Sequence, residues 1–245
     1  MNGTNAAERR PPEPEALTVD AGGAAAPLAT IELDETGDPI SRSGRRELGA
    51  ILRGRRSVRA FRPDPIPREI IAAAIEAAGW APSPHGTQPW RFAVVESAAR
   101  RMALADAMAT PWQVQLDLDR QDPAVAARRL ARSRERLTTA PVVVVVCLYL
   151  EDLDIYPDAA RQEAERIMAI QSLGAATQNF LLEVYAAGLD AGWMCAPLFC
   201  PDIVRETLGL APTLHPQAML PVGYAAADPV RRPRRTTSEL IVVWE

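Results

Sequence analysis

The residues of this sequence best suited to chemistry are three arginines crowded into residues 55–59, whose sequence is Arg-Arg-Ser-Val-Arg. A guanidinium group offers a rigid planar fork of N–H donors, so neighbouring arginines bind phosphate or carboxylate oxygens strongly. Farther along the chain, residues 81–90 combine proline, serine, glycine and threonine in a loop that presents hydroxyl and backbone groups. Together the two segments predict a site for a planar cofactor that carries a phosphate, rather than a metal centre or a covalent nucleophile.

The charge of the whole chain narrows the kind of anion that this site could bind. The net charge is −4 at pH 7, which is not typical of a general nucleic-acid binder. Basic residues are nevertheless clustered at 53–59 and 231–235. We therefore expect a specific anionic ligand, and two solvated charge runs are the alternative.

Cysteine and histidine are scarce, with three and two residues in the chain. A low, odd number of cysteines does not build a disulfide framework, and two histidines exclude a His-rich metal centre. No N-terminal stretch combines a basic start with an apolar core, and no apolar run is long enough to span a membrane. We expect a cytoplasmic protein without a signal peptide or a bound metal.

Hydrophobic spacing predicts a domain in which helices alternate with strands. Residues 1–45 show no sustained period and are expected to form a disordered extension, whereas residues 46–245 form the folded domain. Helices are predicted over residues 47–53, 68–78, 98–108, 123–137, 159–187 and 202–208. Strands are predicted over residues 91–95, 142–149, 189–194, 219–224 and 240–244. The second strand contains five consecutive valines and should be central. This order indicates one mixed α/β domain, whose last strand would pair with its own sheet or with that of a second protomer.

A series of motifs in this order resembles the FMN-dependent nitroreductase superfamily over roughly residues 47–245. The motifs are Arg-Arg-Ser-Val-Arg at 55–59, Ala-Pro-Ser at 81–83, Gln-Pro-Trp-Arg-Phe at 88–92, Gly-Leu at 188–189, Gly-Trp-Met at 192–194 and Leu-Pro-Val-Gly-Tyr at 220–224. The resemblance implies an α+β fold with a central mixed or antiparallel sheet flanked by helices. It also implies a domain-swapped homodimer with FMN at the interface, where residues 55–59 and 83–88 come from different protomers.

A narrower resemblance is to the C-terminal reductase domain of FbiB proteins, which act in coenzyme F-420 biosynthesis. It rests on Ser-Pro-His at 83–85, Ala-Pro at 140–141, Tyr-Pro-Asp-Ala at 156–159 and the cysteine-containing segment 193–201. The N-terminal half of those proteins is a γ-glutamyl ligase, and we expect this chain to lack it and to work beside a separate ligase. The resemblance implies that reduced FMN saturates a C=C bond of dehydro-F-420-0.

The superfamily resemblance also implies which residues hold FMN. It places the phosphate and ribityl chain on residues 55–59, and in an extended turn Arg56 would point away from the other polar side chains. One arginine at 234 is expected to close over the same phosphate, with a solvated linker as the alternative. A backbone N–H near flavin N5 is assigned to Met194 or Cys195, and the alternative role of Cys195 is a small buried apolar residue. The complete predicted set for FMN is Arg55, Arg56, Ser57, Arg59, Ser83, Gln88, Met194, Cys195 and Arg234.

Five residues in two loops are expected to border the substrate, by resemblance to FbiB-like domains: Trp112, Gln115, Asp152, Tyr156 and Asp158. Trp112 could stack on a deazaflavin ring, and Tyr156 could donate a proton or a hydrogen bond. A tryptophan that only packs on a helix face is the alternative. His85 stands where many nitroreductases have asparagine, and we expect a loop histidine with satisfied hydrogen bonds rather than a catalytic group.

Three functions therefore stay open. The first is an FMN-dependent reductase of dehydro-F-420-0. The second is a general NAD(P)H-dependent nitroreductase or flavin reductase; because no G-x-G-x-x-G motif follows a strand, the nucleotide would dock at the flavin itself. The third is a protein that holds FMN or F-420 for a separate γ-glutamyl ligase without turnover. A flavin-cleaving enzyme of cobalamin ligand synthesis shares the fold but fits segment 193–201 less well.

Overall fold

The computed structural model describes residues 42–229 and 233–245, and Arg46–Glu245 make up one compact unit. The extension predicted for residues 1–45 lies almost entirely outside these residues. In the described part of the chain, no helix is both long enough and apolar enough to cross a bilayer.

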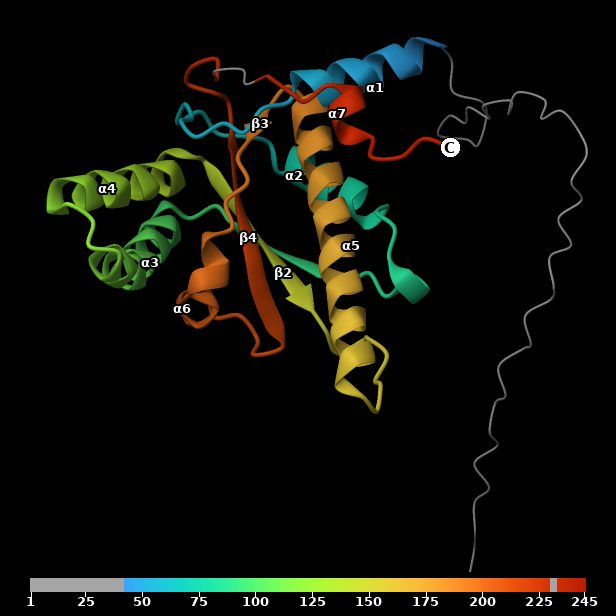
Figure 1. The fold of residues 1–245 in the computed structure, drawn as a ribbon. Coiled ribbons are helices and arrows are strands. Elements are labelled where there is room, and N and C mark those ends of the chain that lie inside the picture. The colour runs from blue at the N-terminus through green and yellow to red at the C-terminus, as the bar shows by residue number, and fades with distance from the viewer. Residues whose placement is uncertain (1–41, 230–232) are drawn as a thin grey trace, which may run out of the picture. The chain divides into compact units, whose positions relative to one another are not determined.

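The centre of the fold is a four-stranded antiparallel sheet with the strand order β1-β2-β4-β3 (Figure 1). The strands are β1 Trp90–Val95, β2 Val142–Tyr149, β3 Asp190–Ala191 and β4 Leu214–Gly223. The prediction that the valine-rich strand is central is confirmed, because β2 pairs with both β1 and β4. A parallel bridge between Ser57 and Ala191 adds a further segment beside β3. The antiparallel pairing of the four strands confirms the helix-flanked sheet that the resemblance implied.

Alternation along β2 supplies both cores of the molecule. Val144 and Val146 face a core that includes α2 and α5, whereas Val143 and Val145 face a core that includes α3, α4 and α6. Side chains on a strand point alternately to opposite faces, and β-branched residues pack well there. Figure 1 accordingly shows α5 on one side of the sheet and α3, α4 and α6 on the other.

The helices follow from their end signals as well as from apolar spacing. Their bounds are α1 Arg42–Gly54, α2 Arg68–Gly79, α3 Ala98–Leu118, α4 Pro123–Thr139, α5 Ala159–Ala186, α6 Pro201–Leu208 and α7 Thr237–Leu240, with short 3₁₀ turns η1 Pro84–Gly86 and η2 Ala196–Phe199. The Asp122 side chain accepts the backbone N–H groups of Ala124 and Val125 and begins α4. Gly188, at φ 81°, follows the end of α5, where a left-handed residue favours glycine.

Four predicted segments differ clearly from the structure in length. The helix predicted over residues 47–53 and the strand predicted over 219–224 are both longer, as α1 and β4. The helix expected to end at Met108 continues as α3 through Pro111 to Leu118. A proline removes one backbone hydrogen bond, but Leu116 is buried at 2% exposure and holds the extra turns against the core. The strand expected over residues 189–194 is only the two-residue β3, followed by an isolated bridge from Met194 to Met219.

The strand predicted over residues 240–244 is wrong for the single chain. A capping box between Thr236 and Glu239 instead starts the short helix α7, and no strand pairing follows it in the described residues. Val242, Val243 and Trp244 are largely exposed. Of the two partners considered for this strand, its own sheet is therefore excluded.

The antiparallel register gives the sheet two chemically different ends. Trp90 pairs with Leu148, so the loops 82–89 and 150–158 meet at one end, which we call the loop end. Segment 55–59 pairs beside β3 at the opposite end, which we call the arginine end. The eight residues of β2 separate the two ends by roughly 25 Å.

Candidate functional site

The arginine segment is fixed to the sheet through its backbone. The Val58 N–H donates to the Ala191 carbonyl at 3.0 Å, next to the Ser57–Ala191 bridge. A Cβ atom on Gly192 would lie 2.6 Å from the Val58 carbonyl oxygen, so a side chain there would push the two segments apart. Glycine at this position permits the close approach, and the segment is held in one place at the arginine end.

Several arginines lie close together at the arginine end. Arg55 is half-buried, and its Nε atom has no hydrogen-bond partner among the residues that the structure describes. Burial lowers the pKa of Arg55 most, and Arg234 and then Arg56 lower it further by repulsion. Arg234, although distant in sequence, therefore lies near Arg55. Arg56 turns its guanidinium back onto the end of α1, where it donates to the Arg53 and Arg55 carbonyls.

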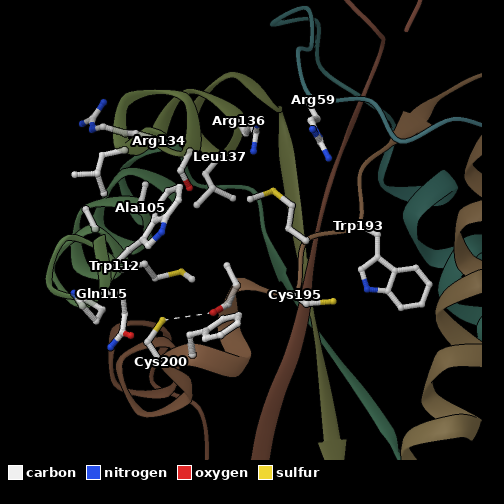
Figure 2. A pocket seen from close by; sticks show the side chains of 18 of the residues that line it. Arg59, Ala105, Trp112, Gln115, Arg134, Arg136, Leu137, Trp193, Cys195 and Cys200 are labelled. Carbon is white, nitrogen blue, oxygen red and sulfur yellow. Dashed lines mark hydrogen bonds between the residues drawn. The ribbon is translucent and has the colours of Figure 1, made fainter. Parts of the chain in front are cut away.

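A cavity of about 530 Å³ opens beside this end, on the face of the sheet covered by α3, α4 and α6 (Figure 2). Its size falls in the range of small-molecule sites. Its walls come from α3, α4, η2 and segment 193–195, and Arg59 closes one side. The structure thereby brings together five of the predicted residues, which are Arg59, Trp112, Gln115, Met194 and Cys195.

The backbone N–H groups of Met194 and Cys195, which both line the cavity, differ in whether they are already bonded. The Met194 N–H is already used, because it donates to the Met219 carbonyl at 3.0 Å. Within the described chain, the Cys195 N–H has no acceptor. The side chain of Cys195 is exposed, which corrects the expectation of a small buried residue, whereas Cys200 is buried and its pKa is raised by that burial.

At the loop end, Ser83 and Gln88 build a tight turn rather than facing the cavity. The Gln88 N–H donates to the Ser83 hydroxyl at 3.1 Å, and Arg91 donates to the Gln88 carbonyl at 3.0 Å. His85 and Gln88 adopt positive φ angles of 55° and 45°. Non-glycine residues in this region store roughly 1–3 kcal/mol of strain and are typical of functional loops.

The other predicted substrate residues also lie at the loop end, each with a partner of its own. The Oδ2 atom of Asp152 lies 3.4 Å from the Nη2 atom of Arg91. Asp158 accepts the Arg161 N–H at 2.9 Å and caps α5, and this bond is the main cause of its lowered pKa. The Tyr156 ring lies 5.3 Å beneath the Arg161 guanidinium. The predicted substrate residues therefore lie in two places. Trp112 and Gln115 line the cavity, whereas Asp152, Tyr156 and Asp158 lie at the loop end and do not line it.

His85 follows the same pattern as its neighbours at the loop end. Its Nε2 atom lies 3.8 Å from an Asp154 carboxylate oxygen, and both side chains are exposed. This contact joins the two loops, but it is too long for a hydrogen bond, so the expectation of a histidine with satisfied hydrogen bonds stays a prediction.

Comparison with known proteins identifies the family of this fold. The model of the nitroreductase family matches residues 52–224. The chain belongs to the nitroreductase family. The match includes the arginine segment, the loop end and the cavity, and it leaves the C-terminal tail outside.

The chain is similar in sequence and in structure to several named oxidoreductases. The chain is 31% identical over 213 residues to an NADH dehydrogenase of Thermus thermophilus, covering 78% of this chain and 92% of that protein. A stretch of 60 residues is 53% identical to nitroreductase NfnB of Mycolicibacterium smegmatis, but it spans only 24% of this chain and 25% of the relative. The solved structure of the FMN-dependent NfnB in complex with NADPH has a TM-score of 0.64 at 25% identity, covering 82% of this chain and 99% of the other.

The structure also places residues in the nitroreductase cavity that the sequence did not single out, chiefly Arg136, Arg134 and Trp193. Helical spacing carried a signal for the first of these. Ser133, Arg136 and Leu137 share one face of α4, and Leu137 is buried at 2% exposure. An arginine beside a buried anchor on the same face points to the edge of the core rather than to bulk solvent.

Proposed function

We propose that this nitroreductase is an FMN-dependent oxidoreductase that oxidises NADH or NADPH. The observation that carries the proposal is the half-buried Arg55, whose Nε has no partner among the described residues, while Arg234 and Arg56 add charge of the same sign. Such a cluster is stabilised by a bound dianion, because each guanidinium then gains charge-assisted hydrogen bonds. The phosphate of FMN has the required charge and oxygen atoms.

The residues present fit the remainder of FMN as well. Ser57 and Arg59 follow Arg55 at alternate positions of an extended segment, and Arg59 reaches the cavity. The unused N–H of Cys195 is the donor available for the flavin ring. When bound, FMN supplies hydride transfer at its N5 atom. The protein contributes the phosphate clamp, the backbone donor and the apolar walls that limit the access of water.

We further propose a homodimer in which two protomers complete each FMN site. The support is the separation of roughly 25 Å between the loop end and the arginine end of one sheet. Ser83 and Gln88 cannot contact a ligand held by Arg55 of the same chain across that distance. In a two-fold dimer, the loop end of one protomer can face the arginine end of the other.

The proposed acceptor is dehydro-F-420-0, whose C=C bond would take up two hydrogens. Its support is the FbiB-like sequence of the cavity segment 193–201 and of Tyr156 and Asp158, together with Trp112 and Gln115 in the cavity wall. In a dimer, the partner's loop end would add the equivalents of Asp152, Tyr156 and Asp158 to this wall. A separate γ-glutamyl ligase is the proposed protein partner of this reaction.

A general nitroreductase that accepts nitroaromatics or quinones fits the fold equally well. The NADH dehydrogenase and the NADPH-bound NfnB among its relatives favour this broader activity. Both readings share the cofactor and the electron donor, and they differ only in the acceptor.

One set of assays tests these proposals. Purified protein should be yellow with a flavin spectrum, and it should oxidise NADH or NADPH in the presence of a nitroaromatic or quinone. Incubation with dehydro-F-420-0 and reduced FMN should raise the mass of the deazaflavin by two hydrogens. Activity on nitroaromatics without that mass gain would favour the general nitroreductase. Tight flavin binding without reoxidation by any acceptor would favour the non-catalytic holder and contradict the proposed enzyme.

A further inference from the structure

Two arginines from distant parts of the chain line the same edge of the cavity. Arg59 comes from the extended segment after α1, and Arg136 comes from the last turn of α4. Figure 2 shows their side chains along one side of the cavity, across from Trp112 and Gln115 on α3. The cavity therefore combines an aromatic wall with a cationic edge.

Arg59 and Arg136 differ in their ion pairing from Arg134, which lies two residues before Arg136 on α4. Arg134 also lines the cavity, but Asp106 neutralises it through a 2.7 Å contact from Nε to Oδ1. In the part of the chain that the structure describes, neither Arg59 nor Arg136 forms a salt bridge, and Asp119 of the cavity wall is paired with neither. Two positive groups thus line the cavity without a salt bridge to any described carboxylate, Asp119 included.

Leaving like charges together in a partly buried place is unfavourable. Burial lowers the pKa of Arg136 most, repulsion from Arg59 and then from Arg132 lowers it further, and attraction to Glu135 offsets a smaller part of the shift. Leu137, the residue after Arg136, is buried at 2% exposure, so α4 could not rotate to turn Arg136 away from the cavity without exposing Leu137. An anion bound between the two guanidinium groups would relieve the repulsion and gain charge-assisted hydrogen bonds.

We propose that Arg136, assisted by Arg59, binds the carboxylate or phosphate group of a planar substrate and so makes this enzyme selective for anionic substrates. This inference rests on the proposed function, because it places the substrate in the same cavity as the flavin. Trp112 offers the aromatic surface for the planar part, and Arg136 lies on the opposite side where an acidic substituent would extend. Arg59 has a second role in the FMN site, so Arg136 is the residue that isolates the effect.

The test compares Arg136→Gln with Arg128→Gln in the FMN-loaded protein. Arg128 lies on the same helix, is exposed, and is outside the cavity lining, so this control removes the same charge from the same element. The acceptors are 4-nitrobenzoate and the neutral 4-nitrobenzyl alcohol. Arg136→Gln should raise KM for the acid roughly 10-fold with little change for the alcohol or in kcat, since one charge-assisted hydrogen bond is lost. Arg136→Lys should recover part of the loss.

A second arm distinguishes the two sources of the anion. The same variants are assayed with NADPH and NADH, which differ by one phosphate group. A rise in KM confined to NADPH would assign the anion to the nucleotide, and one confined to 4-nitrobenzoate would assign it to the acceptor. Either result supports an anion subsite at Arg136. Equal effects on 4-nitrobenzoate and 4-nitrobenzyl alcohol, together with equal effects on NADPH and NADH, would overturn it.

Calorimetry separates this inference from the proposed function. Binding of 4-nitrobenzoate to oxidised, FMN-loaded protein is titrated without a reductant, so that no turnover is needed. Arg136→Gln should weaken this binding roughly 10-fold, and Arg128→Gln should not. If the wild-type protein binds the acid through Arg136 but oxidises no NAD(P)H, the proposed function fails and the anion subsite stands. If turnover occurs but the two variants bind the acid alike, only the subsite fails.

Discussion

The two ends of the central sheet hold their polar side chains in opposite states. At the loop end, Asp152, Tyr156 and Asp158 each have a partner within a few residues or across one strand. At the arginine end, Arg55 and Arg234 approach each other with no opposing carboxylate among the described residues. The polar side chains of the loop end have partners within one chain, whereas those of the arginine end repel one another. The difference supports the proposal that the arginine end binds a phosphate and that the loop end is a preformed surface that meets it in the dimer.

Removing the charge at the centre of the arginine end should have the largest effect on the protein. Arg55→Leu should weaken FMN binding about 100-fold, because charge-assisted hydrogen bonds to the phosphate are lost. Quenching of flavin fluorescence during titration measures the change. Arg53→Leu is the matched control, since Arg53 precedes the segment on α1 and is exposed. Similar losses in both variants would contradict a specific phosphate site at Arg55.

Subunit mixing tests whether the two ends meet in a dimer. Arg55→Leu chains and chains carrying Ser83→Ala with Gln88→Ala should each be nearly inactive. After joint unfolding and refolding, mixed dimers contain one wholly wild-type site, which should restore roughly a quarter of the wild-type sites. Turnover and bound FMN are measured before and after mixing. Mixtures that stay as inactive as their parents would show that each chain builds its site alone.

Moving the arginine segment without changing its charges should have a smaller effect. A Cβ at Gly192 would lie 2.6 Å from the Val58 carbonyl, so Gly192→Ala should destabilise the fold by roughly 1–3 kcal/mol and weaken FMN binding. Chemical denaturation and FMN titration measure the two effects. Gly174→Ala is the control, because its Cβ would meet nothing within 4 Å and alanine favours the α5 helix. A neutral Gly192→Ala would contradict the close approach of the two segments.

The loop end should respond to acid through the cap of α5. Hydrogen bonds from Arg161 lower the pKa of Asp158 from its ordinary 3.8, so its stabilising effect is present above that pH and is lost as pH falls below it. Asp158→Ala should therefore destabilise the protein at pH 7 and destabilise it less at pH 3, where part of the carboxyl group is protonated. Chemical denaturation of the wild-type protein and the variant at the two pH values measures this penalty. A penalty that does not change with pH would assign the effect of the substitution to something other than the charged cap.

The sequence predicts best the elements whose residues carry a local reason. β2 could be placed because five β-branched residues favour a strand, and α5 because its apolar residues recur at helical spacing as far as Gly188. The C-terminal strand could not be placed correctly, because pairing depends on which strand lies beside it. The extension of α3 through Pro111 depends on burial of Leu116, which only the folded core decides.

The candidate site shows the same limit. The arginine segment is visible as a cluster in the sequence, and the resemblance to flavin enzymes linked it to Arg234. Arg136 lies in a helix with several other arginines. Its spacing beside Leu137 marks the edge of the core, but only the placement of α4 shows that Arg136 lines the cavity and that Arg128 does not. That Trp112 and Tyr156 lie in different places also could not be predicted, because it depends on the register of the sheet, which sequence order does not give.

Comparison of FMN with riboflavin tests most directly whether the arginine end binds a phosphate group. The two ligands share the flavin ring and ribityl chain but differ in the phosphate. Apo-protein titrated with each should bind FMN at least about 100-fold more tightly, and Arg55→Leu should remove most of that difference. Equal affinity of the wild-type protein for FMN and riboflavin would contradict the account.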